Sequence, residues 1–355
     1  MKTPGYIAAL AVVLFMPLVV GNVLGQVPYT VTDLGALGEI FGSDAYGINA
    51  KGQVVGSGDF AGHAFLYSGG KMIDLGTLGG PSSIAYGIND DGQVVGWSWT
   101  KDNKMHAFLY SSGKMTDLGT LGGVSSQAKA INAKGQVVGW SHTSRDSHAF
   151  VYSRSWGRMI DFGPLLGGTA NEANAINDRG QVAGCVVPTK WGAIHGFLYD
   201  GVKTKDLGTL GGEHSNAYGI NAKGQVVGGA YTAERPGMHA FLYSDGKMAD
   251  LGTLGGALSA AHGINASGQV VGKAATTQNA TAGNPAWHAF LYSDGKITDL
   301  NTLIAPASRW TLEEAMAIND NGQIVGSGIN PKGKHRAFLL TPTLQTLPSR
   351  AVGCR

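Results

Sequence analysis

Histidine and aspartate recur at fixed positions in this sequence, and their side chains could carry acid–base or metal chemistry. The histidines stand at or near the start of a repeated His-Ala-Phe motif, at His63, His106, His148, His195, His239 and His288, with His335 one place out of register. The aspartates stand in a repeated Asp-Leu-Gly motif, at Asp33, Asp74, Asp117, Asp161, Asp206, Asp250 and Asp299. A reaction needs one asymmetric group of side chains, whereas these residues occur once per repeat. We therefore expect hydrogen bonds inside each repeat and predict no catalytic residues among them.

Other chemical motifs are equally weak. The repeated Gly-Thr-Leu-Gly-Gly linker offers one carboxylate and backbone carbonyls, whereas Ca²⁺ takes about six to eight oxygen ligands. The sequence has no phosphate-binding loop, no nucleophile elbow before a helix, and no zinc motif of the His-Glu-X-X-His or paired-Cys type. Glu313 and Glu314 lie in the longest irregular linker and are interpreted as a solvated surface. No cofactor is predicted, calcium being the one candidate, and an enzyme is not the favoured interpretation.

The elements that position these residues follow from an internal repeat. An Ile-Asn pair ends at Asn49, Asn89, Asn132, Asn177, Asn221, Asn265 and Asn319, mostly 40 to 45 positions apart, with a last gap of 54. A Gly-Gln pair and the Phe of the His-Ala-Phe motif recur in step with it. Seven copies of one unit of this length are typical of a solenoid or a propeller.

Each unit is predicted to form four short strands, typified by AYGIN, QVVGWS, HAFLYS and KMTDLG. Turns such as Asn-Ala-Lys-Gly and Ser-Asp-Gly-Lys join consecutive strands, because Asn accepts backbone N–H bonds and Gly takes positive φ. The third strand is apolar at nearly every residue, so both of its faces need covering. Four antiparallel strands packed between two neighbours make a propeller blade, and a parallel β-solenoid is the alternative.

The chain ends favour the propeller. The fourth-strand motif is missing after the seventh AFLL at 337–340, and a copy stands instead near the start of the expected mature chain, as YTVTDLG at 29–35. We expect the N-terminal strand to join the last blade, which removes two open sheet edges. The fold class is therefore an all-β, seven-bladed β-propeller of four-stranded antiparallel blades over residues 29–341. Its units lie at about 44–76, 84–119, 127–163, 172–208, 216–252, 260–300 and 314–341 plus 29–35, followed by a tail at 342–355.

The motifs HAFLYS, DLGTLGG and GINDDGQVVG resemble the HAF-repeat family of probable extracellular repeat proteins. The resemblance covers roughly residues 29 to 341. It implies export and supplies no activity, cofactor or catalytic residue.

The differences between units point to a ligand. Loops between the second and third strands, and the linkers between blades, emerge on the same face of a propeller, and here both vary in sequence. The turns of the opposite face are short and repetitive, except for the one that holds Trp156. Exposed aromatic rings with scattered polar groups suit a polysaccharide or a peptide. The candidate ligand-binding residues are Trp99, Trp140, His142, Trp191, Tyr231, Trp287, Arg309 and Trp310. Ordinary packing is the alternative role for these rings, above all for Trp97 and Trp140.

The N-terminus predicts export. Lys2 precedes an apolar run at 6–20, and Val23 and Gly25 suit cleavage that leaves a signal peptide of residues 1–25. No transmembrane span is expected after cleavage, because the run is shorter than a spanning helix needs. The protein is then secreted, extracellular or periplasmic, where a disulfide could form. Whether Cys185 and Cys354 pair stays open, since nothing in the sequence fixes their separation.

Composition narrows the partners. The formal net charge is +2 and no run of Lys or Arg stands out, so a nucleic-acid partner is not expected. The favoured function is a monomeric binding module for a polysaccharide or a cell-surface protein. A polysaccharide-cleaving enzyme and a purely structural surface protein are the alternatives.

Overall fold

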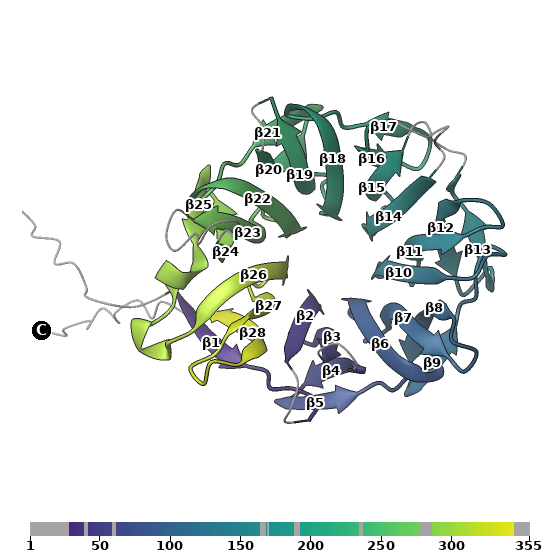
Figure 1. Ribbon diagram of the computed structural model, residues 1–355, viewed down its shortest axis with the longest axis horizontal. Helices are drawn as coiled ribbons and strands as arrows, with labels where there is room; N and C mark the ends of the chain where they lie inside the picture. The colour runs from purple at the N-terminus through teal and green to yellow at the C-terminus, as the bar shows by residue number, and fades with distance from the viewer. Residues whose placement is uncertain are drawn as a thin grey trace, which may run out of the picture.

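The fold is a closed ring of blades. The computed structural model describes residues 28–38, 42–58, 62–163, 168, 170–187, 192–233, 237–276 and 286–343. These residues form seven four-stranded antiparallel sheets around a central axis (Figure 1). The predicted seven-bladed propeller is therefore confirmed. The expected signal peptide, most of the expected tail and Cys354 lie outside the described residues.

The first four blades follow one another along the chain. Blade 1 consists of β2 (Ser43–Ile48), β3 (Val54–Gly58), β4 (Ala64–Ser68) and β5 (Lys71–Asp74). Blade 2 consists of β6 (Gly79–Ile88), β7 (Val94–Thr100), β8 (Met105–Ser111) and β9 (Lys114–Asp117). Blade 3 consists of β10 (Ser126–Ile131), β11 (Val137–His142), β12 (Ser147–Ser153) and β13 (Arg158–Asp161). Blade 4 consists of β14 (Ala170–Ile176), β15 (Val182–Val187), β16 (His195–Tyr199) and β17 (Thr204–Asp206).

The last three blades include the one that closes the ring. Blade 5 consists of β18 (Gly211–Ile220), β19 (Val226–Thr232), β20 (Met238–Ser244) and β21 (Lys247–Asp250). Blade 6 consists of β22 (Gly255–Ile264), β23 (Val270–Thr276), β24 (Trp287–Ser293) and β25 (Lys296–Asp299). Two short 3-10 helices follow, η2 (Leu300–Leu303) and η3 (Pro306–Ser308). Blade 7 consists of β26 (Thr311–Ile318), β27 (Ile324–Ile329), β28 (His335–Pro342) and, from the other end of the chain, β1 (Tyr29–Asp33).

The N-terminal strand completes the last blade as predicted. β1 pairs antiparallel with β28, from Tyr29 opposite Pro342 to Asp33 opposite Phe338. The Leu34 amide continues the ladder by donating to the Ala337 carbonyl at 3.0 Å. β28 is thereby paired on both sides, with β27 and with β1, which is the usual benefit of closure.

Packing between blades explains the repeated apolar residues. One phenylalanine from each third strand is almost fully buried, at Phe65, Phe108, Phe150, Phe197, Phe241, Phe290 and Phe338. The hydrophobic clusters join neighbouring blades: Val95 and Ala107 of blade 2 pack with Phe150 of blade 3. This accounts for third strands that are apolar on both faces.

The repeated glycine of the second strand is required by close approach. A Cβ at Gly228 would overlap the carbonyl oxygen of Asn216 on the first strand, and the same holds at the equivalent glycines of the other blades. The next residue, Gly229, has room for a side chain, because the nearest atom to its Cβ position is Met238 Sδ at 3.4 Å.

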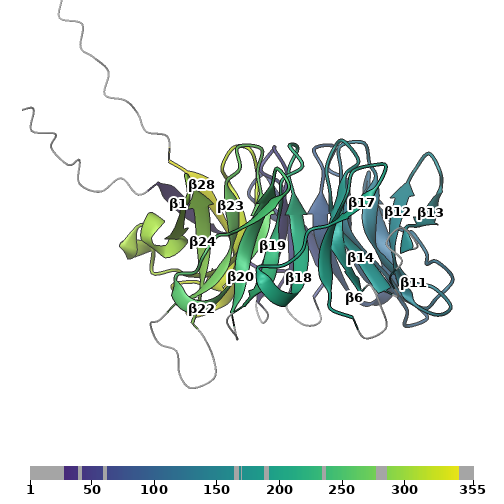
Figure 2. The same ribbon diagram turned by 90° about the horizontal axis from the view of Figure 1, so that it is seen from above.

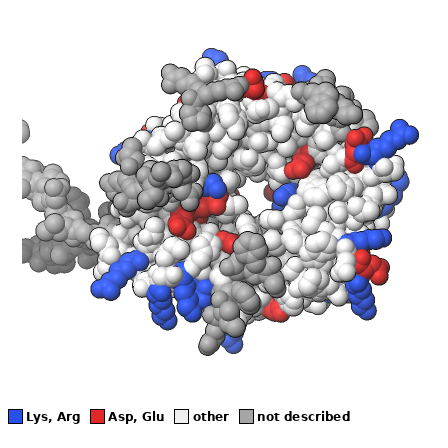
Figure 3. Space-filling model, viewed as in Figure 1, with Lys and Arg blue, Asp and Glu red and all other residues white. Residues whose placement is uncertain are grey.

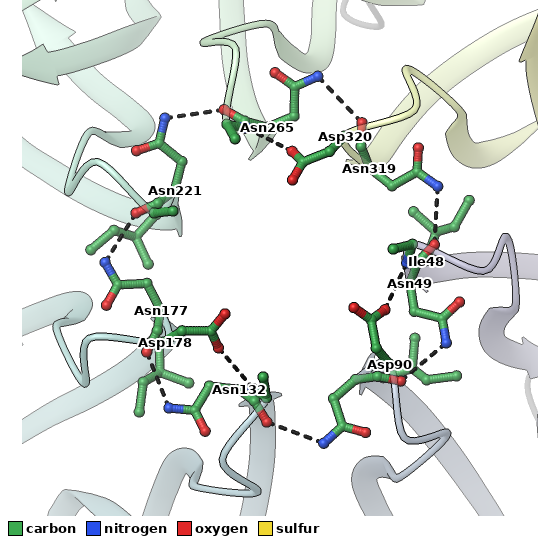
Figure 4. A pocket seen from close by; sticks show the side chains of 18 of the residues that line it. Ile48, Asn49, Asp90, Asn132, Asn177, Asp178, Asn221, Asn265, Asn319 and Asp320 are labelled. Atoms are coloured by element: carbon green, nitrogen blue, oxygen red, sulfur yellow. Dashed lines mark hydrogen bonds between the residues drawn. The ribbon is translucent and has the colours of Figure 1, made fainter.

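The repeated asparagines tie the blades into a ring (Figure 4). Each Asn Nδ2 donates to the backbone carbonyl of the corresponding Asn in the next blade, over 3.0 to 3.3 Å. Each Asn Oδ1 accepts the backbone N–H of the Gln four residues later, as Asn49 does from Gln53 at 3.0 Å. The Ile-Asn repeat is thus explained by structure.

The repeated histidines also act within their blades. Six of them place Nδ1 within 2.7 to 3.0 Å of the aspartate on the neighbouring strand, as in His106 with Asp117. In five of these blades the aspartate also accepts the N–H of the glycine two residues on, at 2.7 Å for Asp117 and Gly119. In blade 6 the donor at this place is Asn301, at 2.9 Å from Asp299. In blade 7, Asn330 takes the place of histidine and donates to Asp33 at 2.8 Å.

The ring has two distinct faces, seen edge-on in Figure 2. The variable face carries the connections from second to third strands and the linkers between blades. The turn face carries the turns that join the first strand to the second and the third to the fourth. Within the described ranges, no helix is long and apolar enough to cross a bilayer.

Candidate functional site

A channel along the axis is lined by the innermost strand of each blade: β2, β6, β10, β14, β18, β22 and β26. On the turn face, a cavity of about 260 Å³ is lined by the repeated Ile-Asn pairs. Deeper in, a cavity of about 390 Å³ is lined by six of the same isoleucines and by the residues before them. The seven isoleucines form an apolar band, the isoleucine tier, and all of them except Ile176 line both cavities: Ile48, Ile88, Ile131, Ile176, Ile220, Ile264 and Ile318.

Two further tiers lie toward the variable face, and their residues vary from blade to blade. The middle tier lines the larger cavity and consists of Tyr46, Tyr86, Lys129, Asn174, Tyr218, His262 and Met316. Two residues earlier, on the same face of each strand, stands the mouth tier. It consists of Asp44, Ile84, Gln127, Glu172, Asn216, Ala260 and Glu314. The channel is thus uniform at one end and chemically diverse at the other.

One side of the mouth is built around Glu314. Its Oε1 lies 2.9 Å from His262 Nε2 and 3.0 Å from Lys273 Nζ. Burial alone raises the pKa of Glu314, but His262 and Lys273 outweigh burial and hold the pKa at about 2. The adjacent Glu313 behaves oppositely, since burial raises its pKa even though His335 and His288 lower it.

The sequence-based interpretation of this acidic pair is wrong. Glu313 and Glu314 were expected on a solvated linker, yet both lie partly buried in β26. The irregular segment ends earlier, because η2 and η3 take up the extra residues and Thr311 begins the strand. His335, one place out of register, faces the same region, with Nε2 3.8 Å from Asp44 Oδ1 and 3.9 Å from Glu313 Oε2.

A second charged group lies across the channel. Lys129 Nζ sits 4.6 Å from the centre of the Tyr86 ring. Burial lowers the pKa of Lys129, and nearby Glu172 opposes that shift. Burial, reinforced by Glu172, raises the pKa of the Cys185 thiol to about 12, so it stays protonated. Figure 3 shows acidic and basic side chains on both sides of the central opening.

Aromatic rings lead from the rim of blade 2 to the channel. Trp99 and Trp97 meet edge to face, with ring centres 6.2 Å apart. Trp97 Nε1 lies 3.4 Å from the Tyr86 hydroxyl, and the Tyr86 ring lies 5.2 Å from that of Tyr46. Burial raises the pKa of Tyr46 and Tyr86, which keeps both phenols neutral. We call these four rings the aromatic track.

The predicted site residues divide into two groups. Trp99, His142 and Tyr231 share one position, near the end of the second strand, where each packs against the second glycine of the preceding linker. In blade 3, the Nε1–H of Trp140 donates to Gln127 Oε1 at 2.8 Å, and the Trp140 and His142 ring centres lie 5.2 Å apart with the rings tilted by 46°.

The remaining predicted residues are more scattered. Trp287 lies beneath Lys273, with Nζ 5.2 Å from the ring centre. Trp310 packs at 6.2 Å against Phe338 and belongs to the core of blade 7. Arg309 is exposed at the end of η3 in left-handed conformation, with φ 52°. Trp191 lies outside the described residues.

Sequence reasoning missed the middle and mouth tiers. The signal was present in the residues before each Ile-Asn pair, which change from AYG to AKA, ANA, AHG and AMA between units. Among the described residues, no group of three or more His, Cys, Asp or Glu side chains is arranged to hold a metal ion.

Comparisons with solved structures concern the fold alone. TolB from Acinetobacter baumannii is 14% identical, with a TM-score of 0.42, over 67% of this chain and 60% of that chain. A gluconolactonase from Xanthomonas campestris is 12% identical, with a TM-score of 0.42, over 89% of this chain and 90% of that chain. The acylaminoacyl peptidase of Pyrococcus horikoshii is 10% identical, with a TM-score of 0.46, over 86% of this chain and 53% of that chain.

Sequence comparison corrects the expected family. The family model that matches is described as a protein of unknown function (DUF3466), and it matches residues 80–170 and 211–338. The HAF-repeat resemblance is therefore wrong as a family assignment. No curated protein sequence matches the chain.

Proposed function

The chain belongs to the DUF3466 family, and we propose that it is an exported binding module that holds a polysaccharide at the axial mouth of its variable face. Export rests on the apolar N-terminal run and the small residues Val23 and Gly25 that follow it. The binding role rests on the channel.

One observation carries the proposal. All seven blades have the same four-stranded fold. Residues that the fold requires should therefore be alike at equivalent positions in every blade. The isoleucine tier obeys this expectation. The middle tier does not, since it holds Tyr, Lys, Asn, His and Met at one equivalent position. Side-chain diversity that folding does not require points to a ligand.

The chemistry of these tiers suits a sugar chain. Neutral tyrosines, amides and charged groups can donate to and accept from hydroxyls, and the aromatic track offers flat apolar surfaces for pyranose rings. Buried hydroxyls need hydrogen-bond partners. The isoleucine tier has none to offer, so we place the inner limit of the ligand there.

Lys129→Met tests the proposal with little risk to the fold, because Met316 occupies the equivalent position in blade 7. The full chain is titrated by calorimetry with β-glucan, xylan, chitin and alginate oligosaccharides of two to eight units. Wild-type protein should bind at least one series. Lys129→Met and Trp99→Ala should weaken that binding at least about tenfold.

Trp156→Ala is the matched control, because Trp156 is 47% exposed on a third-to-fourth-strand turn of the turn face. It should bind like wild type. Failure of the wild-type protein to bind any of the four series, or equal binding by all variants, contradicts a glycan-binding mouth and favours a structural or protein-binding role.

A second candidate, glycan cleavage, is favoured by Glu313 and Glu314. Their pKa values are shifted in opposite directions, and glycoside hydrolysis uses one protonated and one ionised carboxyl. Release of reducing ends from the same four polysaccharides, abolished by Glu314→Gln and by Glu313→Gln, would support it. Unchanged substrates after prolonged incubation count against it.

A further inference from the structure

Blade 5 carries a cavity of its own on the variable face. It measures about 570 Å³ and shares no lining residue with the axial cavities. It lies where the linker into blade 5 meets the end of the second strand, since Leu210 pairs with Thr232 there. Its lining consists of Gly211, Gly212, Glu213, His214, Tyr231, Thr232 and Ala233.

The other blades show that folding does not require these side chains. The two residues after the Gly-Gly pair are Pro81-Ser82 in blade 2, Val124-Ser125 in blade 3 and Ala257-Leu258 in blade 6. Only blade 5 has Glu213-His214 there. The position of Tyr231 is filled by alanine in blade 6, at Ala275, which packs against the linker glycine in the same way. Serine and alanine therefore satisfy the fold at these positions.

Hydrogen bonding fixes the tautomer of His214. The backbone N–H of Ile194 donates to His214 Nδ1 at 2.9 Å. Because Nδ1 accepts, the proton of the neutral imidazole is carried by Nε2, which is left as a donor. The imidazole meets the Tyr231 ring edge to face, with centres 5.7 Å apart.

The cavity thus combines three features that recognise one sugar ring. Tyr231 is 40% exposed and offers an aromatic face. The exposed Glu213 supplies a carboxylate acceptor, and His214 Nε2–H supplies a donor. Adjacent hydroxyls of a pyranose need an acceptor and a donor side by side, beside an apolar platform for the ring.

We propose that the blade 5 cavity is a second glycan subsite, which stacks one pyranose on Tyr231 and holds its adjacent hydroxyls with Glu213 and His214. The choice of a glycan rests on the proposed function of the axial mouth. A polymer long enough to reach both places is then held at two points. Two linked contacts raise overall affinity by roughly 10²- to 10⁴-fold over one contact.

The test uses Tyr231→Ala and His214→Ser, residues that blades 6 and 2 already accommodate, in the full chain. Thermal unfolding checks that both variants are folded. Binding is measured against β-glucan, xylan, chitin and alginate, as disaccharides to octasaccharides and as polymers, with Lys129→Met as the axial comparison. Both blade 5 variants should bind polymer at least about tenfold more weakly than wild type, with disaccharide binding at the axial mouth unchanged.

Two results overturn the subsite and differ in what they say of the axial mouth. If the blade 5 variants bind every polymer like wild type while Lys129→Met does not, the subsite is wrong and the axial function stands. If wild-type protein binds no member of the panel, both fail.

Discussion

Asn319 donates its side-chain amide to the backbone carbonyl of Asn49 at 3.0 Å, although 270 positions separate them in the chain. The equivalent hydrogen bond links each of the remaining six pairs of neighbouring blades. Blades 7 and 1, which meet where the ring closes, are therefore joined by the same hydrogen bond as blades that follow one another along the chain.

This equality predicts the effect of removing one amide. Asn319→Ala and Asn132→Ala each leave a buried backbone carbonyl without its hydrogen-bond donor. Each substitution should therefore lower the free energy of unfolding by about 1–3 kcal/mol. Urea denaturation of both variants measures it. A large loss for Asn132→Ala with none for Asn319→Ala would show that the ring is open at the junction.

The second-strand glycines give a paired test of close packing. Gly228→Ala forces a Cβ onto the Asn216 carbonyl and should cost about 3 kcal/mol or prevent folding. Gly229→Ala, one residue later, meets only Met238 at 3.4 Å and should change stability by less than about 1 kcal/mol. Urea denaturation of both variants measures the difference. An equal loss of stability in the two variants would contradict the close-packing argument.

Glu314 predicts a loss of stability in acid. Its pKa in the folded protein is about 2, against an ordinary value of 4.5, so its contribution is complete above pH 4.5 and is lost as the pH falls toward 2. The gap corresponds to at most about 3 kcal/mol. Unfolding free energy measured from pH 6 to pH 2 should fall less steeply for Glu314→Gln than for wild type. Parallel curves for the two proteins would contradict this role of Glu314.

The thiol of Cys185 should be unreactive toward alkylating reagents in the folded protein. Burial raises the pKa of its thiol to about 12, and the thiolate is the reactive species. In a Cys354→Ser background, iodoacetamide at pH 8 should leave Cys185 unmodified for hours and label it promptly in urea. Mass spectrometry reads the result, and rapid labelling of the native protein would disprove the burial argument.

Seven-fold repetition made the fold predictable from sequence. Tyr29 to Asp33 supply the fourth-strand motif that the last unit lacks, and they pair with β28 as the split repeat predicts. Trp310 shows the limit of such reasoning, because a tryptophan in a variable linker can turn inward onto Phe338 as well as outward. The amino-acid sequence does not distinguish the inward orientation of such a ring from the outward one.

The channel residues were harder to find for a geometric reason. A strand alternates its side chains between two faces, but the sequence alone does not say which of the two faces points to the axis. Without the observed register, the sequence does not reveal that Lys129 faces the axis while Ala128 packs between blades. Glu314 was misplaced because the length of the linker before it suggested a loop.

The Velcro-like pairing of β1 with β28 also sets an order of events in folding. Thr30 and Thr341 contact each other across 311 residues, the kind of distant contact that forms late. β1 is made before the rest of the propeller, so it cannot pair until β28, the last strand of the domain, has been synthesised. Until then, blade 7 lacks its outer strand, and any chain released early carries two unsatisfied edges ready to pair with a neighbour.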